Sequence, residues 1–248
     1  MVLKDLQHIR YKRFFFSVNE YFLTDKASMT ADINYCIQCS ENINNTLNEF
    51  YTLLINLSQP EESIKQDIYH RTLTEINSFV GNQDYEYKLL IDFSDKDLNQ
   101  FIRSFNQFAV EKKIRRAEVF RLKAYQKAGI LAISYIKQKN AFLFINFYRL
   151  TKERAANINS FSVQESEKYF SPSHLGRAHR TLHWLDILEF KKAGVNYYDF
   201  CGWYSGNTDR ALLNINTFKE QFTKNKVKEY TGVLYKNKFL IFILKILK

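Results

Sequence analysis

The alternation of hydrophobic and polar positions predicts a chain in which strands and helices follow one another. Apolar residues recur every three or four positions over 98–109, and this spacing is typical of a helix with one buried face. Ser94 and Asp97 match a capping box and set the start of this helix. Two strand-like runs, 130–137 and 141–149, flank a short polar segment, so we expect a β-hairpin there.

The same pattern predicts elements on both sides of this central region. We expect further strands at 14–16, 33–37, 85–93, 195–200 and 227–234, and helices at 43–57, 61–81, 115–128, 176–193 and 216–222. Their order is typical of an α/β fold with one mixed sheet. Because Gly81 and Asn82 end a helix, we divide the chain into an N-terminal subdomain, 1–84, and a main domain, 85–248.

The composition narrows the class of protein. The 248 residues are 46% hydrophobic and 25% charged, which excludes a wholly disordered or collagen-like chain. The net charge of +10 favours anionic partners such as phosphorylated cofactors, nucleic acid or lipid headgroups. No secretory signal is visible at the start, and the longest apolar run, 239–244, is far below the roughly 20 residues of a membrane-spanning helix. We therefore expect a soluble, cytoplasmic protein.

The C-terminal segment 239–248 is apolar and carries Lys245 and Lys248. One interpretation is a last element of the core. The other is a peripheral contact with anionic headgroups at the inner face of a membrane. The sequence leaves both open.

The spacing of cysteine and histidine predicts no metal site. Cys36 and Cys39 form a C-x-x-C, but no second pair of Cys or His lies at the spacing of a zinc site, so we expect both to be buried free thiols. His179, His183 and Asp186 form one polar stripe on a predicted helix, yet the first and last lie roughly 10 Å apart along its axis. We expect a half-buried polar face there, with His183 and Asp186 as a hydrogen-bonded pair, and keep His183 as a candidate acid–base residue.

The start of the helix predicted at 176–193 carries residues suited to phosphate. Amides in a first helical turn have no partner within the helix and lie at the positive end of its dipole. The candidate cofactor-binding residues are Leu175, Gly176, Arg177, Ala178 and Arg180. Glycine allows close approach of a phosphate, and arginine supplies charge. An ordinary junction between a loop and a helix explains the same residues.

Two further candidates lie downstream. Asp199 ends a predicted strand, where open α/β sheets gather their ligands, and is placed to meet an amine or a hydroxyl. Lys219 lies on a short predicted helix and is suited to a phosphate or an oxyanion. Simpler interpretations exist for both, because an Asp at a strand end often binds backbone amides and most lysines are solvated.

These motifs resemble a known superfamily. Gly176-Arg177-Ala178 after an antiparallel hairpin is similar to the acyl-CoA pyrophosphate loop of the GNAT superfamily. Over about 85–235 the chain resembles GNAT-like proteins of bacterial surface-polysaccharide clusters and the second half of Fem-type (FemAB-like) aminoacyl-transferases. The resemblance is carried by Gly176-Arg177-Ala178, Leu182-His183-Trp184, Asp186, Gly194, Tyr198-Asp199-Phe200, Gly202, Ile215-Asn216, Phe218-Lys219 and Phe222.

The resemblance implies a GNAT-like acyltransferase fold with an N-terminal extension or a partial second lobe. Three positions depart from the family pattern, namely Ser173, Cys201 and Thr223. These departures leave open whether the donor is acyl-CoA, an aminoacyl-tRNA or another compound.

The resemblance also implies roles for individual residues. The segment 175–180 would hold acyl-CoA, for example acetyl-CoA, as co-substrate. Asp199 would receive the proton of the acceptor amine, and Tyr204 would protonate the leaving thiolate. Lys219 would neutralise an oxyanion or a donor phosphate.

Three functions follow as expectations. The leading one is an N-acyltransferase that moves an acyl group from acyl-CoA to the amine of an amino sugar or glycan in bacterial cell-envelope synthesis. The second is a Fem-like transferase that uses aminoacyl-tRNA, which makes RNA a partner. The third is a non-catalytic module that binds a membrane surface through 239–248.

Overall fold

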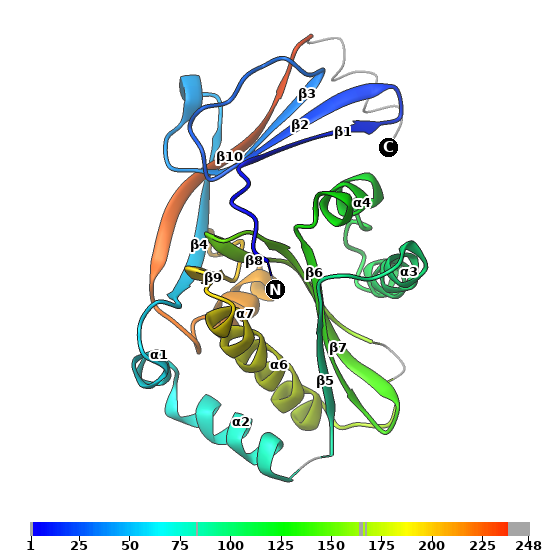
Figure 1. Cartoon of the computed structure of the whole chain (residues 1–248). Coiled ribbons are helices and arrows are strands. Elements are labelled where there is room, and N and C mark those ends of the chain that lie inside the picture. The colour runs from blue at the N-terminus through cyan, green and yellow to red at the C-terminus, as the bar shows by residue number, and fades with distance from the viewer. Residues whose placement is uncertain (1, 83, 164–165, 167, 238–248) are drawn as a thin grey trace.

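The computed structural model describes residues 2–82, 84–163, 166 and 168–237. These residues form one mixed ten-stranded sheet in the order β1-β2-β3-β10-β4-β9-β8-β7-β6-β5, which curves strongly between its two edges (Figure 1). The predicted α/β class with a single mixed sheet is therefore confirmed.

The strands are β1 His8–Arg13, β2 Phe16–Phe22, β3 Ile33–Cys39, β4 Asn48–Asn56, β5 Glu86–Leu90, β6 Leu131–Gln138, β7 Ala141–Leu150, β8 Arg154–Ser162, β9 Tyr197–Asp199 and β10 Lys226–Tyr235. The helices are α1 Glu61–Asp67, α2 His70–Asn82, α3 Asp95–Glu111, α4 Val119–Ala128, α6 Pro172–Lys192 and α7 Arg210–Lys219, with a short 3-10 turn, η1, at Ile43–Asn45.

Helices cover both faces of the sheet. α1, α2 and α6 lie on one face, and α3 and α4 lie on the other, inside the curve of the sheet (Figure 1). Neighbouring residues of β7 serve the two faces, because successive side chains of a strand point to opposite sides. Tyr148 packs with Phe190 of α6, whereas Phe147 packs with Phe105 of α3. The sheet is therefore buried on both sides in its middle.

The N-terminal and C-terminal strands meet in the middle of the sheet. β10 pairs antiparallel with β3 on one side and with β4 on the other, and β4 pairs with β9. The predicted boundary near residue 84 lies between α2 and β5. The sheet is continuous across it, so the segments on either side of residue 84 contribute strands to one sheet.

Several local predictions are confirmed. Ser94 and Asp97 form the capping box at the start of α3, with hydrogen bonds in both directions. β6 and β7 form the predicted hairpin. Cys36 and Cys39 are buried free thiols.

Other local predictions are wrong. The helix predicted at 43–57 is mostly β4, which lies between β10 and β9. Because its apolar half is buried, the sequence there is a continuous apolar run that periodicity does not separate from a helix. Phe14 and Phe15 form the turn between β1 and β2 instead of starting a strand, with Phe14 at φ 54°. β8 has no counterpart in the prediction, because its sequence RAANINSFS lacks an apolar alternation.

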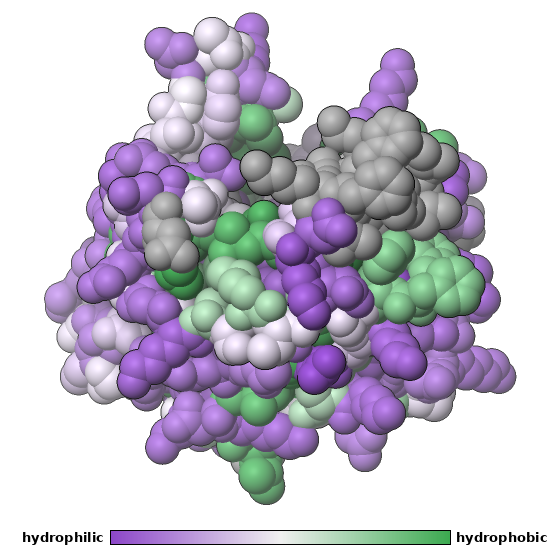
Figure 2. All heavy atoms as spheres, turned by 90° about the horizontal axis from the view of Figure 1, so that it is seen from above, coloured by the Kyte–Doolittle hydropathy of each residue, from purple (hydrophilic) through white to green (hydrophobic). Residues whose placement is uncertain are grey.

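The surface is largely hydrophilic. Seen from above, polar side chains cover most of the face, with separate apolar patches between them (Figure 2). No helix in the described ranges is long and apolar enough to cross a membrane. The segment 239–248, for which the sequence suggests a membrane contact, lies outside the described residues.

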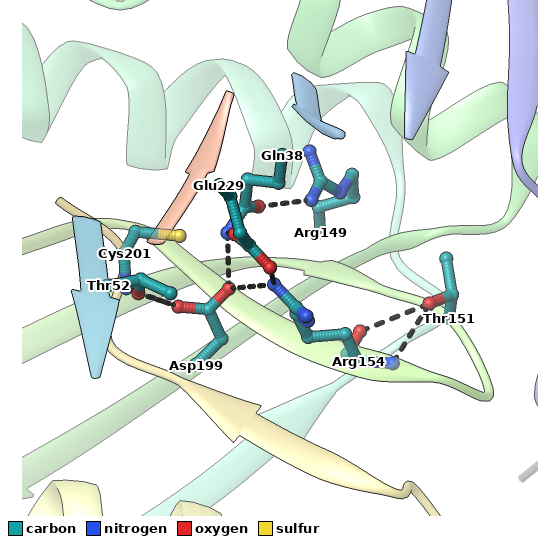
Figure 3. A network of polar contacts seen from close by, with 8 residues as sticks. All are labelled: Gln38, Thr52, Arg149, Thr151, Arg154, Asp199, Cys201 and Glu229. Carbon is teal, nitrogen blue, oxygen red and sulfur yellow. Dashed lines mark hydrogen bonds and ion pairs between the residues drawn. The ribbon is translucent and has the colours of Figure 1, made fainter. Parts of the chain in front are cut away.

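A cluster of buried charges joins the central strands (Figure 3). Nη1 of Arg154, on β8, lies 3.2 Å from Oδ2 of Asp199 on β9 and 2.8 Å from Oε1 of Glu229 on β10. Gln38, on β3, donates to both carboxylates at 2.6 and 3.0 Å. Because all four side chains are buried, each carboxylate depends on Arg154 for its compensating charge.

Replacing Arg154 with methionine is therefore expected to lower the free energy of unfolding by about 3–5 kcal/mol at neutral pH. Two buried carboxylates then face each other without a cation. The loss shrinks as the pH falls, because burial already raises the pKa of Glu229 and protonation removes its charge. Chemical denaturation at several pH values measures both effects. Arg103→Met, on the exposed surface of α3, is the control, and an equal effect of both substitutions contradicts the prediction.

Candidate active site

β8 and β9 separate in the middle of the sheet. They pair in parallel only between Arg154–Ala156 and Tyr197–Asp199. Beyond that point β8 continues to Ser162 beside β7, whereas the amide of Phe200 bonds to the carbonyl of Leu53 on β4. A gap therefore opens between two strands that are neighbours in the sheet.

A pocket of about 290 Å³ lies at this gap, on the face that α6 covers. It is bounded by β8, α6, α7 and the chain just after β9. The lining residues are Asn157, Ser160, His179, His183, Phe200, Asn214, Ile215, Phe218 and Lys219. Two predicted site residues, His183 and Lys219, thus meet at one pocket.

The two histidines of α6 lie one helical turn apart and touch each other. The ring of His179 is stacked between Phe144 and Phe218, with centroid distances of 4.3 and 4.4 Å. Its Nε2 lies 3.0 Å from Nε2 of His183 and 2.8 Å from Oγ of Ser160. The i, i+4 spacing seen in the sequence therefore brings the two rings together at the wall of the pocket.

A chain of hydrogen bonds runs from His183 into the interior. Nδ1 of His183 lies 2.5 Å from the hydroxyl of Tyr198, which lies 2.8 Å from the hydroxyl of Tyr148. Tyr148 in turn donates to Oδ2 of Asp186 at 2.6 Å. The sequence predicts a possible direct pair between His183 and Asp186, but the structure joins them through two tyrosines.

Burial sets the charge of these groups. It lowers the pKa of His179 to about 3 and the pKa of His183 well below its usual value, so both rings are neutral near pH 7. Burial raises the pKa of Asp186 to about 6, although hydrogen bonds from Tyr148 and other donors oppose the shift. The chain of hydrogen bonds thus ends on a carboxyl group that exchanges its proton close to neutral pH.

Lys219 reaches the pocket from the last turn of α7. Its ammonium donates to the carbonyls of Cys201 and Gly202, the latter at 2.6 Å, and thereby ties α7 to the loop after β9. Burial lowers the pKa of Lys219, while Cys201 and Asp199 act in the opposite direction. A cation thus stands at the mouth of a mostly apolar pocket.

Asp199 does not line this pocket. Its side chain is fully buried and accepts hydrogen bonds from Gln38, Thr52, Arg154 and the amide of Cys201. Four donors occupy the positions that a carboxylate offers. The arrangement suits a structural anion, and the role of Asp199 as a base stays a prediction.

Tyr204 also lies away from the pocket walls. Its hydroxyl is 3.2 Å from Oγ1 of Thr208, and its backbone exchanges two hydrogen bonds with the side chain of Asn216 on α7. Tyr204 is therefore not among the residues that line the pocket with His183 and Lys219. Its proposed role as an acid stays a prediction.

The predicted start of the long helix is wrong. α6 begins at Pro172, with Ser171 as N-cap, because serine at the cap and proline in the first turn start a helix more strongly than a glycine does. The amide of Leu175 already donates to the carbonyl of Ser171 at 3.0 Å. The amides of 176–178 therefore lie inside the helix and are not free to hold a phosphate.

The arginines of this segment differ in their partners. The guanidinium of Arg180 donates to Gln221 and to the carbonyl of Gly176, both at 2.9 Å, and lies 3.3 Å from the carboxylate of Glu75. Arg177 is half-buried. Cofactor binding by the segment 175–180, including buried Leu175 and Ala178, stays a prediction.

Sequence reasoning missed several residues of the site. Ser160 and Asn157 belong to β8, which the sequence does not predict. Ser134 and Tyr148, which donate to Asp186, are polar positions inside the apolar runs of β6 and β7, and that contrast was the usable signal. No group of three or more His, Cys, Asp or Glu that fits a metal ion occurs in the part of the chain that the structure covers.

Comparison with known proteins shows the fold. No family model and no curated protein sequence matches this chain. Among solved structures it is similar to FemX, with a TM-score of 0.56 and 8% identity, covering 79% of this chain but only 64% of FemX.

Two further similarities agree with this one. The C-terminal domain of a putative lysylphosphatidylglycerol synthetase from Agrobacterium fabrum gives a TM-score of 0.51 at 12% identity, over 86% of this chain and 70% of that chain. L-PGS from Bacillus licheniformis gives a TM-score of 0.51 at 13% identity, over 86% of this chain and 71% of that chain. The chain therefore shares the fold of these proteins, and the predicted Fem-like fold is confirmed.

The neutral histidines make stability depend on pH. Between about pH 4 and 6 the unfolded chain protonates His179 and His183, whose ordinary pKa is about 6.5, while the native state does not. Each histidine therefore makes the free energy of unfolding rise with pH, by at most about 1.4 kcal/mol per unit. Asp186 makes the free energy of unfolding fall as the pH rises over this range. Its pKa is raised in the native state, so the native state keeps the proton to a higher pH than the unfolded chain does.

The substitution His179→Phe removes one of the two histidines that make the free energy of unfolding rise with pH. A phenylalanine ring fits in its place, between the rings of Phe144 and Phe218. We expect the rise in the free energy of unfolding between pH 4 and 6 to be smaller by about 2–3 kcal/mol in this variant. Urea denaturation at both pH values measures the difference. The same pH dependence in the two proteins contradicts a neutral, buried His179.

Proposed function

We propose that this chain is an N-acyltransferase that moves an acyl group from acyl-CoA to an amine, with an amino sugar as the expected acceptor. The observation that carries this proposal is the gap between β8 and β9, which opens on a pocket holding both His183 and Lys219. An activated carbonyl in this gap would have a neutral base on one side and a cation on the other.

The pocket suits the acyl end of the donor. Phe200, Phe218 and Ile215 supply apolar walls, and about 290 Å³ suffices for a short acyl group with its thioester. Asn157 and Ser160 add polar atoms on the β8 side. The donor's phosphates would lie outside this pocket, because the amides of 176–178 are used within α6.

His183 is the proposed base. An amine acceptor arrives largely as ammonium and must lose a proton before it becomes a nucleophile. His183 takes this proton at Nε2, where the amine would replace the contact with Nε2 of His179, and releases its Nδ1 proton to Tyr198. Tyr198 passes a proton to Tyr148, and Tyr148 passes one to Asp186. The ammonium and the carboxylate thereby become a neutral amine and a neutral carboxylic acid.

Acyl transfer then follows in two bond changes. The amine nitrogen attacks the thioester carbon, and a C–N bond forms while the carbonyl oxygen becomes an oxyanion. Lys219 would stabilise this oxyanion through its ammonium. The C–S bond then breaks, and the second proton of the nitrogen neutralises the thiolate.

His183→Gln tests the proposed base. With acetyl-CoA and a panel of nucleotide-linked amino sugars, we expect kcat/KM to fall about 100- to 10,000-fold, because general base catalysis is lost. Binding of CoA by calorimetry should stay within about twofold of wild type. His70→Gln, on the exposed start of α2, should leave both values unchanged.

The donor class is tested in the same experiment. The net charge of +10 and the likeness to a domain of a putative lysylphosphatidylglycerol synthetase favour an aminoacyl ester as the second candidate. That donor predicts tRNA binding that weakens steeply with salt, because each phosphate contact releases counterions. Absence of both CoA binding and transfer from acetyl-CoA, with transfer from aminoacyl-tRNA, contradicts the acyl-CoA assignment.

Tyr198→Phe interrupts the hydrogen-bond chain without touching the pocket wall. We expect kcat to fall about 10- to 100-fold while KM for the donor is unchanged, because the proton on His183 no longer reaches Asp186. Tyr197→Phe removes a neighbouring hydroxyl that makes no hydrogen bond to any residue the structure describes. Equal kcat values for the two variants contradict the relay.

A further inference from the structure

A second pocket, of about 320 Å³, lies on the opposite side of β8. It is lined from β3, β7, β8 and the segment that leads into α4. The side chains that give it its character are Gln38, Arg115, Arg116, Glu118, Arg121 and Arg149. Four arginines and one glutamate thus share one cavity.

Residues of β8 and of the chain just after β9 line both pockets, so these two segments lie between the pockets. On β8, Asn157 and Ser160 line the first pocket, whereas Ile158 and Asn159 line the second. A register shift in the pairing of β7 with β8 at this place lets neighbouring residues face both sides. After β9, Phe200 lines the first pocket and Cys201 the second. The second pocket therefore adjoins the gap at which acyl transfer is proposed.

Arg149 is the unusual residue of this cavity. Its side chain is only 2% exposed, and its guanidinium donates to Oε1 of Gln38 at 2.7 Å and lies 4.6 Å from the ring of Phe22. Figure 3 shows this hydrogen bond to Gln38, which connects Arg149 to the charged cluster. Among the described residues no carboxylate lies within ion-pair distance of Arg149, whereas Arg154 nearby has two. A buried cation without an anion is costly, so the site is arranged to receive one.

The other arginines of the pocket are compensated unequally. Arg121 pairs with buried Glu20 at 2.5 Å, and Arg115 pairs with Glu118. Arg116, at the rim, has no ion pair within the described ranges and is exposed. A buried and an exposed guanidinium are thus left to bind an anion with two or more charged oxygens.

We propose that this arginine-lined pocket binds the phosphate or diphosphate ester of the acceptor and so places its amine at the gap between β8 and β9. This inference rests on the proposed acyl transfer. The planar fork of a guanidinium matches phosphate oxygens with paired hydrogen bonds, and a buried guanidinium binds them more strongly than an exposed one. Either a soluble sugar nucleotide or a phospholipid headgroup presents this group.

Calorimetry with inorganic pyrophosphate tests the site without any acyl donor. We expect saturable binding to the wild-type chain and at least tenfold weaker binding to Arg149→Gln, because charge-assisted hydrogen bonds are lost. Arg149→Lys should bind with an intermediate affinity. Arg103→Gln, an equal loss of charge elsewhere on the surface, should match the wild type. Arg116→Gln should weaken binding about threefold, and it keeps the test valid if Arg149 variants fail to fold.

Competition separates the two sources of the phosphate. Displacement of pyrophosphate by UDP-glucosamine assigns the site to a soluble acceptor. Displacement by phosphatidylglycerol vesicles, but not by phosphatidylcholine vesicles, assigns it to a lipid headgroup. An excess of CoA should not displace pyrophosphate, because the donor binds on the other side of β8.

Two results overturn the inference. One is pyrophosphate binding that Arg149→Gln and Arg116→Gln leave unchanged. The other is displacement of pyrophosphate by CoA alone. Either result is compatible with acetyl transfer and with its loss in His183→Gln, so failure of this inference is distinct from failure of the proposed function.

Discussion

The ion pairs of Arg154 with Asp199 and Glu229 fix the geometry on which the site depends. They join β8, β9 and β10, which come from distant parts of the sequence, at the centre of the sheet. Asp199 also accepts the amide of Cys201, and Cys201 has a left-handed backbone with φ 46°. The chain therefore leaves β9 directly after its last paired residue. The gap beside β8 opens at that point because Asp199 is held in place.

Two pockets of different chemical character adjoin the gap and share the same short segments of chain. On the side of α6, aromatic rings and burial keep two histidines neutral beside a single lysine. On the other side, arginines outnumber acids, and Arg149 is buried with no carboxylate beside it in the part of the chain that the structure describes. An apolar pocket suits a thioester or an aminoacyl ester, and a cationic pocket suits a phosphorylated acceptor. Under the proposed function, the acyl donor and the phosphorylated acceptor would meet at the gap between β8 and β9, which both pockets adjoin.

Part of the fold follows from local sequence alone. The capping box before α3 and the hairpin of β6 and β7 are set by neighbours in sequence, and both are confirmed. β4 and β8 are different, because their conformation depends on strands that lie on either side of them. Their amino acids permit a helix or a loop, and pairing with distant strands decides the outcome. The sequence pattern predicted the start of α6 at Gly176, although Ser171 and Pro172 carried the correct local signal for a start at Pro172.

The candidate site divides in the same way. The sequence by itself determined that His183 and Lys219 lie on helices with polar positions among apolar ones, and the structure brings both to one pocket. Only the tertiary structure decided that Asp199 is enclosed by four donors and that two tyrosines connect His183 with Asp186. It also decided that Arg149 has no acidic partner among the described residues. Spacing along a helix is a property of neighbouring residues. Burial, charge compensation and hydrogen-bond partners depend on residues from distant strands, so no local pattern records them.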